Sequence, residues 1–227
     1  KHPVWCRFIP EAHSMMVPFQ IHSQKPYPIR AMLAFGLNHR MWPGSDFARE
    51  SFKKLDFWVD VDLFITDTAK LADVVVPACS SYERSELKFY PEKRILWTRA
   101  AIEPLGQSRS GADIIFDLAA SLAPDDDLLR SGYEASVDWM LEPSGFKVAD
   151  LKQHPRGLVV ENVSIPSYHK YEKNGFKTPS GKMEFTSCVL ADHGLDPLPV
   201  YREPMLSPIS TPEAAQDFPL ILTTGAR

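Results

Sequence analysis

Residues 57–77 read FWVDVDLFITDTAKLADVVVP, and this stretch decides the fold of the chain. The apolar run at 57–65 predicts one strand, and the valines that end at Pro77 predict a second, shorter strand. Only the short helical turn TDTAKLA separates them, with Asp73 expected to cap it. Two strands so close together, joined by a short crossover, favour a parallel sheet with right-handed connections.

The neighbouring segments extend the same α/β pattern in both directions. IRAMLAFG predicts a strand covered on both faces, and DFARESFKKL predicts a helix with Ser45 as its N-cap. RILWTRAAI (94–102) indicates another strand or extended stretch, and SGADIIFDLAASLA (110–123) an amphipathic helix. We therefore predict a Rossmann-like, mostly parallel sheet flanked by helices.

The rest of the chain is less regular. EASVDWML predicts a short helix, and FKTPSGKMEF places Pro-Ser-Gly between two short alternating runs, which is a β-hairpin signal. A proline-rich linker then leads to DFPLILTTGAR, which we expect to begin the first strand of a truncated β-rich domain. The predicted parts are a loop-like lead-in (1–28), the Rossmann-like lobe (29–124), an irregular extension with the hairpin (125–205), and the linker with the start of a further domain (206–227).

Composition excludes several classes of protein. A net charge of -4 argues against a nucleic-acid partner, and no apolar run reaches the roughly 20 residues of a membrane-spanning helix. Cys6, Cys79 and Cys188 are too few and too scattered for a disulfide framework, an iron–sulfur cluster or a structural zinc site. The sequence shows no signal peptide, and because it begins at Lys1 we expect a fragment.

Motifs for the common nucleotide and hydrolase sites are absent. G-x-G-x-x-G does not occur, which disfavours a nicotinamide dehydrogenase, and neither do G-x-x-x-x-G-K-[ST], G-x-S-x-G or H-E-x-x-H. Open parallel sheets nevertheless bind ligands at the carboxyl ends of their strands. Two such ends are visible, at residues 36–39 and 60–66.

Four polar residues near these ends are candidates for binding a ligand. Asp62 stands at the tip of a strand, where its carboxylate could accept two hydrogen bonds from a guanine edge or a ribose diol. It could equally cap the next turn, and Asn38 could be an ordinary turn residue. Arg84 could be a solvated surface charge, and Asp113 a helix N-terminal cap. No single residue decides between these interpretations.

The order and spacing of the motifs decide between these interpretations. G-x-N after the first strand, V-D-x-F-x-T-x-T-A-x-x-A-D-V-V-V-P, Glu83-Arg84, Arg94, Asp113, T-P-S-G-K-M-E-F and P-L-I-L-T-T-G follow one another along the chain. This series resembles the dimethyl sulfoxide reductase superfamily of molybdopterin oxidoreductases, most of all its anaerobic dehydrogenase and acetylene hydratase-like group. The likeness covers about 27–227 and is most specific at 58–77.

The resemblance implies roles for particular residues. Asp62 would bind the guanosine end of a pterin guanine dinucleotide, with backbone contact from Val61 beside it. Asn38 would lie in the loop that lines the cofactor, Arg84 would reach its charged groups, and Asp113 would face the guanosine. Relatives often carry a small polar residue where Val61 stands, and a lysine at the position of Arg84.

The end of the chain also matches the family. Thr224 and Gly225 would open the pterin-contacting strand and loop of the last domain, which makes residues 206–227 the start of a truncated C-terminal molybdopterin dinucleotide-binding domain. Relatives read T-G-R here, whereas this chain has Ala226 before Arg227. Arg227 would be a further cofactor contact.

The implied cofactor is a molybdopterin guanine dinucleotide with molybdenum or tungsten, and the full-length protein would carry a 4Fe-4S cluster in its N-terminal region. The metal ligand would lie upstream too, so we predict no catalytic or metal-binding residue here and no activity from the fragment alone. Expected partners are the remaining domains of the same polypeptide and an iron–sulfur electron-transfer subunit. The expected source is a bacterium or archaeon living without oxygen, and the expected compartment is the cytoplasm, or the periplasm if an upstream signal exists.

Several functions compete. The leading one is a molybdopterin-dependent oxidoreductase, in which the cofactor carries the electron chemistry and the protein positions it. A tungsten or molybdenum hydratase without redox turnover is the alternative within the enzymes. A respiratory-complex scaffold that has lost the cofactor is a non-catalytic alternative, which the presence of Asn38, Asp62 and Asp113 together disfavours. A generic nucleotide-binding module would leave TPSGKMEF and LTTG unexplained.

Overall fold

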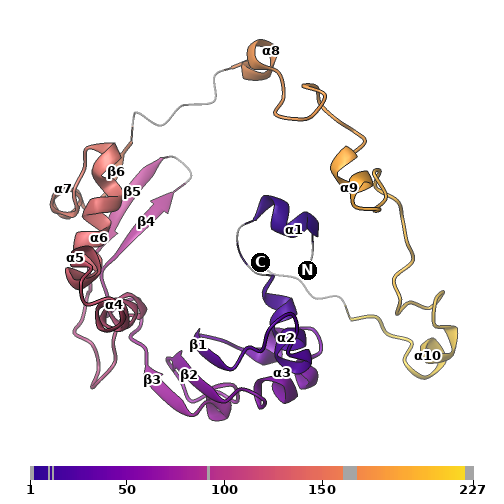
Figure 1. The fold of residues 1–227 in the computed structure, drawn as a ribbon, viewed down its shortest axis with the longest axis horizontal. Helices are drawn as coiled ribbons and strands as arrows, with labels where there is room; N and C mark the ends of the chain where they lie inside the picture. Colours follow the sequence, from indigo (N-terminus) through magenta and orange to yellow (C-terminus); the bar gives the residue numbers. More distant parts are fainter. Residues whose placement is uncertain (1–2, 10, 12, 91–92, 161–167, 223–227) are drawn as a thin grey trace. The chain divides into compact units, whose positions relative to one another are not determined.

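The computed structural model describes residues 3–9, 11, 13–90, 93–160 and 168–222 (Figure 1). The chain divides into two compact units. Residues 12–167 form the unit that contains both sheets, which we call the sheet unit. Residues 1–11 and 168–227 form the other, which we call the terminal unit.

Three parallel strands form the first sheet of the sheet unit, in the order β1-β2-β3. They are β1 (Ala31–Phe35), β2 (Phe57–Asp62) and β3 (Val74–Pro77). Asp60 of β2 lies between Ala34 of β1 and Val75 of β3. Because the strands are parallel, their carboxyl ends share one edge of the sheet. The α/β class with a Rossmann-like parallel sheet is thus confirmed.

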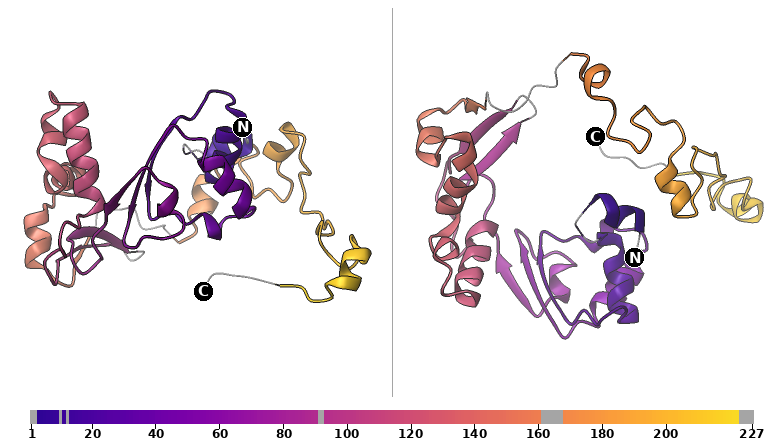
Figure 2. Two further views of the ribbon diagram at one scale, coloured as in Figure 1. Left: turned by 90° about the horizontal axis from the view of Figure 1, so that it is seen from below. Right: turned by 45° about the horizontal axis from the view of Figure 1, so that its top comes forward.

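Helices α2 (Val17–Ser23) and α3 (Ser45–Phe52) pack against this sheet (Figure 2). Their apolar side chains meet the sheet in one core, where the Phe52 and Trp58 rings lie 5.4 Å apart. The buried members of this core are Ile21, Ala34, Ala48, Phe52 and Trp58. The predicted helix is therefore present, but it begins one residue earlier than expected, with Gly44 at the N-cap position in the left-handed conformation.

The first 28 residues are not loop-like throughout, which corrects the expectation. They contain α1 (Pro3–Phe8), the 3₁₀ helix η1 (Ser14–Met16) and α2. Ile21 of α2 is 1% exposed in the core, so tertiary packing stabilises a segment without a clear helical period. Pro18 is tolerated because it stands in the first turn of α2.

The crossover between β2 and β3 is as short as predicted and contains the 3₁₀ helix η3 (Ala69–Leu71). Asp73 does not cap this turn. Its Oδ2 accepts a hydrogen bond of 2.7 Å from the backbone N–H of Trp58, and its own N–H donates to the Trp58 carbonyl. Asp73 therefore extends the pairing of the two strands at their amino ends. It bonds to the backbone of β2 instead of capping the turn before it.

A second, antiparallel sheet follows in the order β4-β5-β6. Its strands are β4 (Glu86–Tyr90), β5 (Arg94–Thr98) and β6 (Leu158–Val159). The sequence predicted an extended segment from residue 94 but not β4, whose alternating charges indicated a solvated surface. The core of this sheet contains Ile95, Trp97, Val137, Leu141, Val148 and Leu151.

Helix α4 (Gly111–Leu122) is the predicted amphipathic helix, with Ser110 as its N-cap. Ile114 and Leu118 line a small cavity together with Leu33 of β1 and Phe57 of β2, so α4 lies against the face of the parallel sheet away from α3. The elements that follow are α5 (Asp127–Arg130), α6 (Gly132–Leu141), the 3₁₀ helix η4 (Glu142–Ser144) and α7 (Val148–Gln153).

The terminal unit contains only helices and turns among its described residues: α1, α8 (Lys170–Asn174), α9 (Cys188–Asp192) and α10 (Pro212–Asp217). The predicted hairpin at 176–185 is a turn without paired strands. The Phe176 N–H donates to the Gly181 carbonyl at 3.0 Å, and Thr178 Oγ1 donates to the Lys182 carbonyl at 2.6 Å. These local bonds satisfy the backbone where a ladder was expected, and residues 218–222 are not in a strand.

Within the part of the chain that the structure describes, no helix is both long enough and apolar enough to cross a membrane.

Candidate functional site

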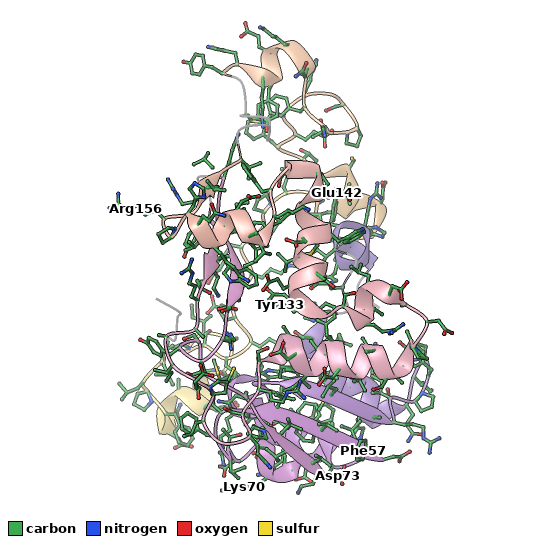
Figure 3. All side chains as sticks on the ribbon, turned by 90° about the vertical axis from the view of Figure 1, so that its left-hand side faces the viewer. Phe57, Lys70, Asp73, Tyr133, Glu142 and Arg156 are labelled. Atoms are coloured by element: carbon green, nitrogen blue, oxygen red, sulfur yellow. The ribbon has the colours of Figure 1, made fainter. Side chains whose placement is uncertain are left out.

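A cavity of about 400 Å³ opens at the carboxyl ends of β1, β2 and β3. In Figure 3, Phe57 and Asp73 mark the amino ends of β2 and β3, and Tyr133 marks the start of α6, which contributes to the cavity wall. The lining residues come from the three strand ends, from the start of β4, from the first turn of α4 and from the start of α6: Phe35, Gly36, Val61, Asp62, Leu63, Ala78, Cys79, Arg84, Ser85, Glu86, Ser110, Gly111, Ala112 and Tyr133. Parallel sheets bind ligands at this edge.

Asp62 is one of two carboxylates that line this cavity, and Glu86 is the other. Asp62 is the last residue of β2, and its main-chain carbonyl accepts a hydrogen bond of 3.0 Å from Ala78. One side-chain oxygen, Oδ1, accepts a hydrogen bond of 3.3 Å from the Phe64 N–H, which is the turn-capping role weighed against ligand binding. Within the described residues Oδ2 has no hydrogen bond, so Asp62 can cap the turn and still accept from a ligand.

Val61 lies beside Asp62 and is 2% exposed. Its carbonyl accepts a hydrogen bond of 2.9 Å from the Gly36 N–H, which ties β2 to the loop after β1. Gly36 has a φ of 59°, a conformation that glycine adopts without strain. A backbone contact from Val61 to a ligand stays a prediction.

Arg84 forms the opposite wall of the cavity. Its Nη1 donates to the Cys79 carbonyl at 3.3 Å, and its Nε lies 3.4 Å from a carboxylate oxygen of Glu86. The side chain is 34% exposed, so the guanidinium is held in place but not sealed from solvent. This position suits contact with an anionic group in the cavity.

Asp113 lies outside this cavity. It lines an adjoining one of about 610 Å³, which shares Arg84, Ser85, Ser110 and Tyr133 with the first. Ser110 Oγ is the N-cap acceptor for the Asp113 N–H at 3.0 Å and donates to the Asp113 carboxylate at 2.7 Å. Asp113 therefore supports the cap instead of providing it.

Of the other predicted residues, the structure describes Asn38 alone. Asn38 does not line either cavity; its Oδ1 accepts from the Arg40 N–H at 3.1 Å and caps the 3₁₀ helix η2 (His39–Met41). Thr224, Gly225 and Arg227 lie outside the described residues. The structure thus groups Val61, Asp62 and Arg84 in one cavity and Asp113 in its neighbour.

Sequence reasoning did not single out Tyr133. Its hydroxyl accepts a hydrogen bond of 3.2 Å from the Leu87 N–H, and its ring stacks on Trp97 with centroids 5.9 Å apart. These contacts join α6 to β4 and β5 between residues more than 30 positions apart in sequence, so no local sequence pattern predicts them. Tyr133 gives both cavities an aromatic wall.

Two buried groups near the site are electrostatically unusual. Burial raises the pKa of the Cys79 thiol, so this thiol is a poor nucleophile or metal ligand. Burial, with a smaller effect from the charge of Asp62, raises the pKa of Asp60 to about 6. Among the described residues no group of His, Cys, Asp and Glu is arranged to hold a metal ion.

Comparison with known proteins gives a family match. A family model described as molybdopterin oxidoreductase matches residues 22–121, which contain the parallel sheet and nearly all of α4. Over these residues the chain matches the molybdopterin oxidoreductase family. The matched residues include the three strand ends and the α4 turn that line the cavity, and the resemblance to the dimethyl sulfoxide reductase superfamily is confirmed.

Relatives of this chain include acetylene hydratase of Syntrophotalea acetylenica, 30% identical over 90% of this chain and 28% of the relative. The alpha subunit of the F420-dependent formate dehydrogenase of Methanocaldococcus jannaschii is 31% identical over 81% of this chain and 25% of the relative. The solved structure of acetylene hydratase from Pelobacter acetylenicus matches with a TM-score of 0.78 and 29% identity, covering 93% of this chain and 29% of that one. The chain thus spans about a quarter of the length of these proteins.

Proposed function

We propose that this part of the molybdopterin oxidoreductase binds the guanine end of a pterin guanine dinucleotide in the cavity at the carboxyl ends of β1–β3. The observation that carries the proposal is the position of Asp62, which ends the central strand, lines the cavity and has one carboxylate oxygen without a hydrogen bond among the described residues. A guanine edge presents two adjacent N–H donors, which a carboxylate accepts in pairs.

The residues around Asp62 fit such a ligand. Phe35, Cys79 and Tyr133 provide apolar and aromatic walls for a flat base, and Arg84 provides a cation for the anionic part of the molecule. The adjoining cavity, entered past Arg84 and Tyr133, gives an extended ligand further room. A dinucleotide is longer than one base pocket, so we assign both cavities to it.

The pterin cofactor, when bound with molybdenum or tungsten, supplies the two-electron chemistry of the family, whereas the residues of this chain bind and orient it. Asp62 would hold the guanine and Arg84 the charged groups. A metal ligand, a 4Fe-4S cluster and an electron-transfer partner would come from other parts of the enzyme, so we propose that this chain alone turns over no substrate.

A hydratase is the second candidate. Acetylene hydratase matches this chain in sequence over 90% of its length and in structure over 93%. Two other relatives favour redox chemistry instead: the assimilatory nitrate reductase catalytic subunit of Bacillus subtilis and the dimethyl sulfoxide/trimethylamine N-oxide reductase of Cereibacter sphaeroides. The cavity described here serves either enzyme, because it would hold the dinucleotide and not the substrate.

Isothermal titration calorimetry of the chain with GDP tests the proposal, and a separate titration with ADP provides the comparison. We expect GDP to bind more tightly than ADP. Asp62→Asn replaces an acceptor by a donor and should weaken GDP binding by roughly 10- to 100-fold, the value of a charge-assisted hydrogen-bond pair.

Asp56→Asn is the matched control for this titration. It changes an exposed carboxylate at the amino end of β2 that pairs with Arg30, and it should leave the affinity for GDP unchanged. Equal binding of GDP by the wild type and by Asp62→Asn would contradict the proposal.

A further inference from the structure

Two loops of the sheet unit run side by side next to the cavity. One connects β3 to β4 (residues 78–85) and the other connects β5 to α4 (residues 99–110). Backbone hydrogen bonds join them: Cys79 N–H to the Arg109 carbonyl at 2.9 Å, and Ala101 N–H to the Tyr82 carbonyl at 2.7 Å. Each loop leads directly into part of the cavity wall.

Glu83 is a side chain that bonds to both loops. Its Oε2 accepts a hydrogen bond of 2.6 Å from the Ser80 N–H within its own loop. Its Oε1 accepts one of 2.7 Å from the Leu105 N–H in the other loop. The hydrogen bonds from Ser80 and Leu105 lower the pKa of Glu83, which keeps the carboxylate ionised at neutral pH.

The two sides of this link carry cavity residues. The hydrogen bond from Ser80 to Glu83 closes a turn, and the cavity residues Cys79 and Arg84 stand directly before and after this turn. Arg84 also donates to the Cys79 carbonyl. On the other side, Leu105 stands five residues before Ser110, the N-cap of α4 and a cavity residue. Glu83 itself does not line the cavity at the strand ends, although it lines the adjoining one.

We propose that Glu83 is a positioning residue: one carboxylate ties the β3–β4 loop to the β5–α4 loop and thereby holds Arg84 and Cys79 in the wall of the cofactor cavity. The identity of the ligand rests on the proposed function, whereas the tie between the loops rests on the geometry alone. The test therefore has one arm that needs no ligand.

Glu83→Gln is the informative substitution, because it keeps the size of the side chain but leaves only one acceptor oxygen for two N–H donors. Cys79 is a built-in probe, since its side chain is only 2% exposed. Alkylation with iodoacetamide, followed by peptide mapping, distinguishes it from the other cysteines. We expect Glu83→Gln to label Cys79 about tenfold faster or more, as expected for local opening without global unfolding.

Gln107→Asn, a change at an exposed position of the β5–α4 loop that lines neither cavity, is the control and should label like the wild type. Amide hydrogen exchange separates positioning from general stability. In Glu83→Gln the Ser80 and Leu105 amides should exchange faster while those of β1–β3 keep their protection. Loss of protection throughout the sheet, or Cys79 labelled at the wild-type rate, would overturn the proposal.

A GDP titration of the same variants keeps the two proposals apart. If the wild type does not bind GDP but Glu83→Gln exposes Cys79, the proposed function fails and the tie stands. If the wild type binds GDP and Glu83→Gln binds it equally, with Cys79 still protected, the tie fails and the proposed function stands. Weaker GDP binding together with faster labelling supports both.

Discussion

Asp60 makes the stability of the sheet unit depend on pH in an unusual direction. Its side chain is 0% exposed, and in the described residues neither carboxylate oxygen has a hydrogen-bond partner. Burial, together with the charge of Asp62, raises its pKa from 3.8 to about 6. The folded state therefore holds this proton more tightly than the unfolded chain, and the difference amounts to about 3 kcal/mol when fully expressed.

The sign follows from this difference. The contribution of Asp60 to folding is fully present below about pH 4, where both states are protonated, and it is lost as the pH rises through about 6. Asp60→Asn removes the titration. Measured against this variant, the wild type should become more stable by about 1.4 kcal/mol as the pH falls from about 7.5 to about 5.

Urea unfolding followed by tryptophan fluorescence measures this difference, because Trp58 lies in the same core and is 1% exposed. Keeping the pH above about 5 leaves carboxylates of lowered pKa, such as Glu50 and Asp67, ionised throughout. Asp56→Asn is the exposed control and should follow the wild type. A wild-type stability that tracks Asp60→Asn at every pH would refute the reasoning, because it would mean that the Asp60 carboxylate is solvated in the folded state.

Two further predictions concern a glycine in a strained backbone conformation and the N-cap of α4. Both are measured by the same unfolding experiment. Gly157→Ala would place its Cβ 2.5 Å from the Ile95 carbonyl oxygen at a φ of 76°, so we expect the free energy of unfolding to fall by about 2 kcal/mol or more. Gly106 has a similar φ but open space around it, so Gly106→Ala should lower the free energy of unfolding by about 1 kcal/mol. Equal costs would show that the backbone contact is relieved. Ser110→Ala removes the N-cap of α4 and should cost about 1 kcal/mol, whereas Ser121→Ala in the last turn should stay within about 0.5 kcal/mol. A Ser110→Ala variant as stable as the wild type would contradict the capping role.

The parallel sheet could be predicted from sequence because its signals are local. Apolar runs of strand length, Pro77 at a strand end and Ser110 before a helical period each act within a few residues. Asp62 could be found for the same reason, since a carboxylate at the end of a buried strand is visible in the run itself. Grouping Asp62 with Arg84 needed the resemblance to a family.

The rest depends on contacts between distant residues. The charged segment of β4 carries no clear strand signal in the sequence. The strand forms because β5 pairs with it and because Glu86 and Lys88 form an ion pair. Tyr133 reaches the site from α6 through a bond to Leu87 that no periodicity encodes. Asn38 caps its own turn through its side-chain oxygen, and its place in the loop that lines the cofactor stays a prediction.

A crystal structure of the chain with GDP tests the central claim most directly. We predict that the guanine lies in the cavity at the carboxyl ends of β1–β3, with its ring N–H and amino group within about 2.7–3.2 Å of the Asp62 carboxylate. Guanine bound elsewhere on the chain, or in this cavity with Asp62 facing no ligand atom, would contradict it.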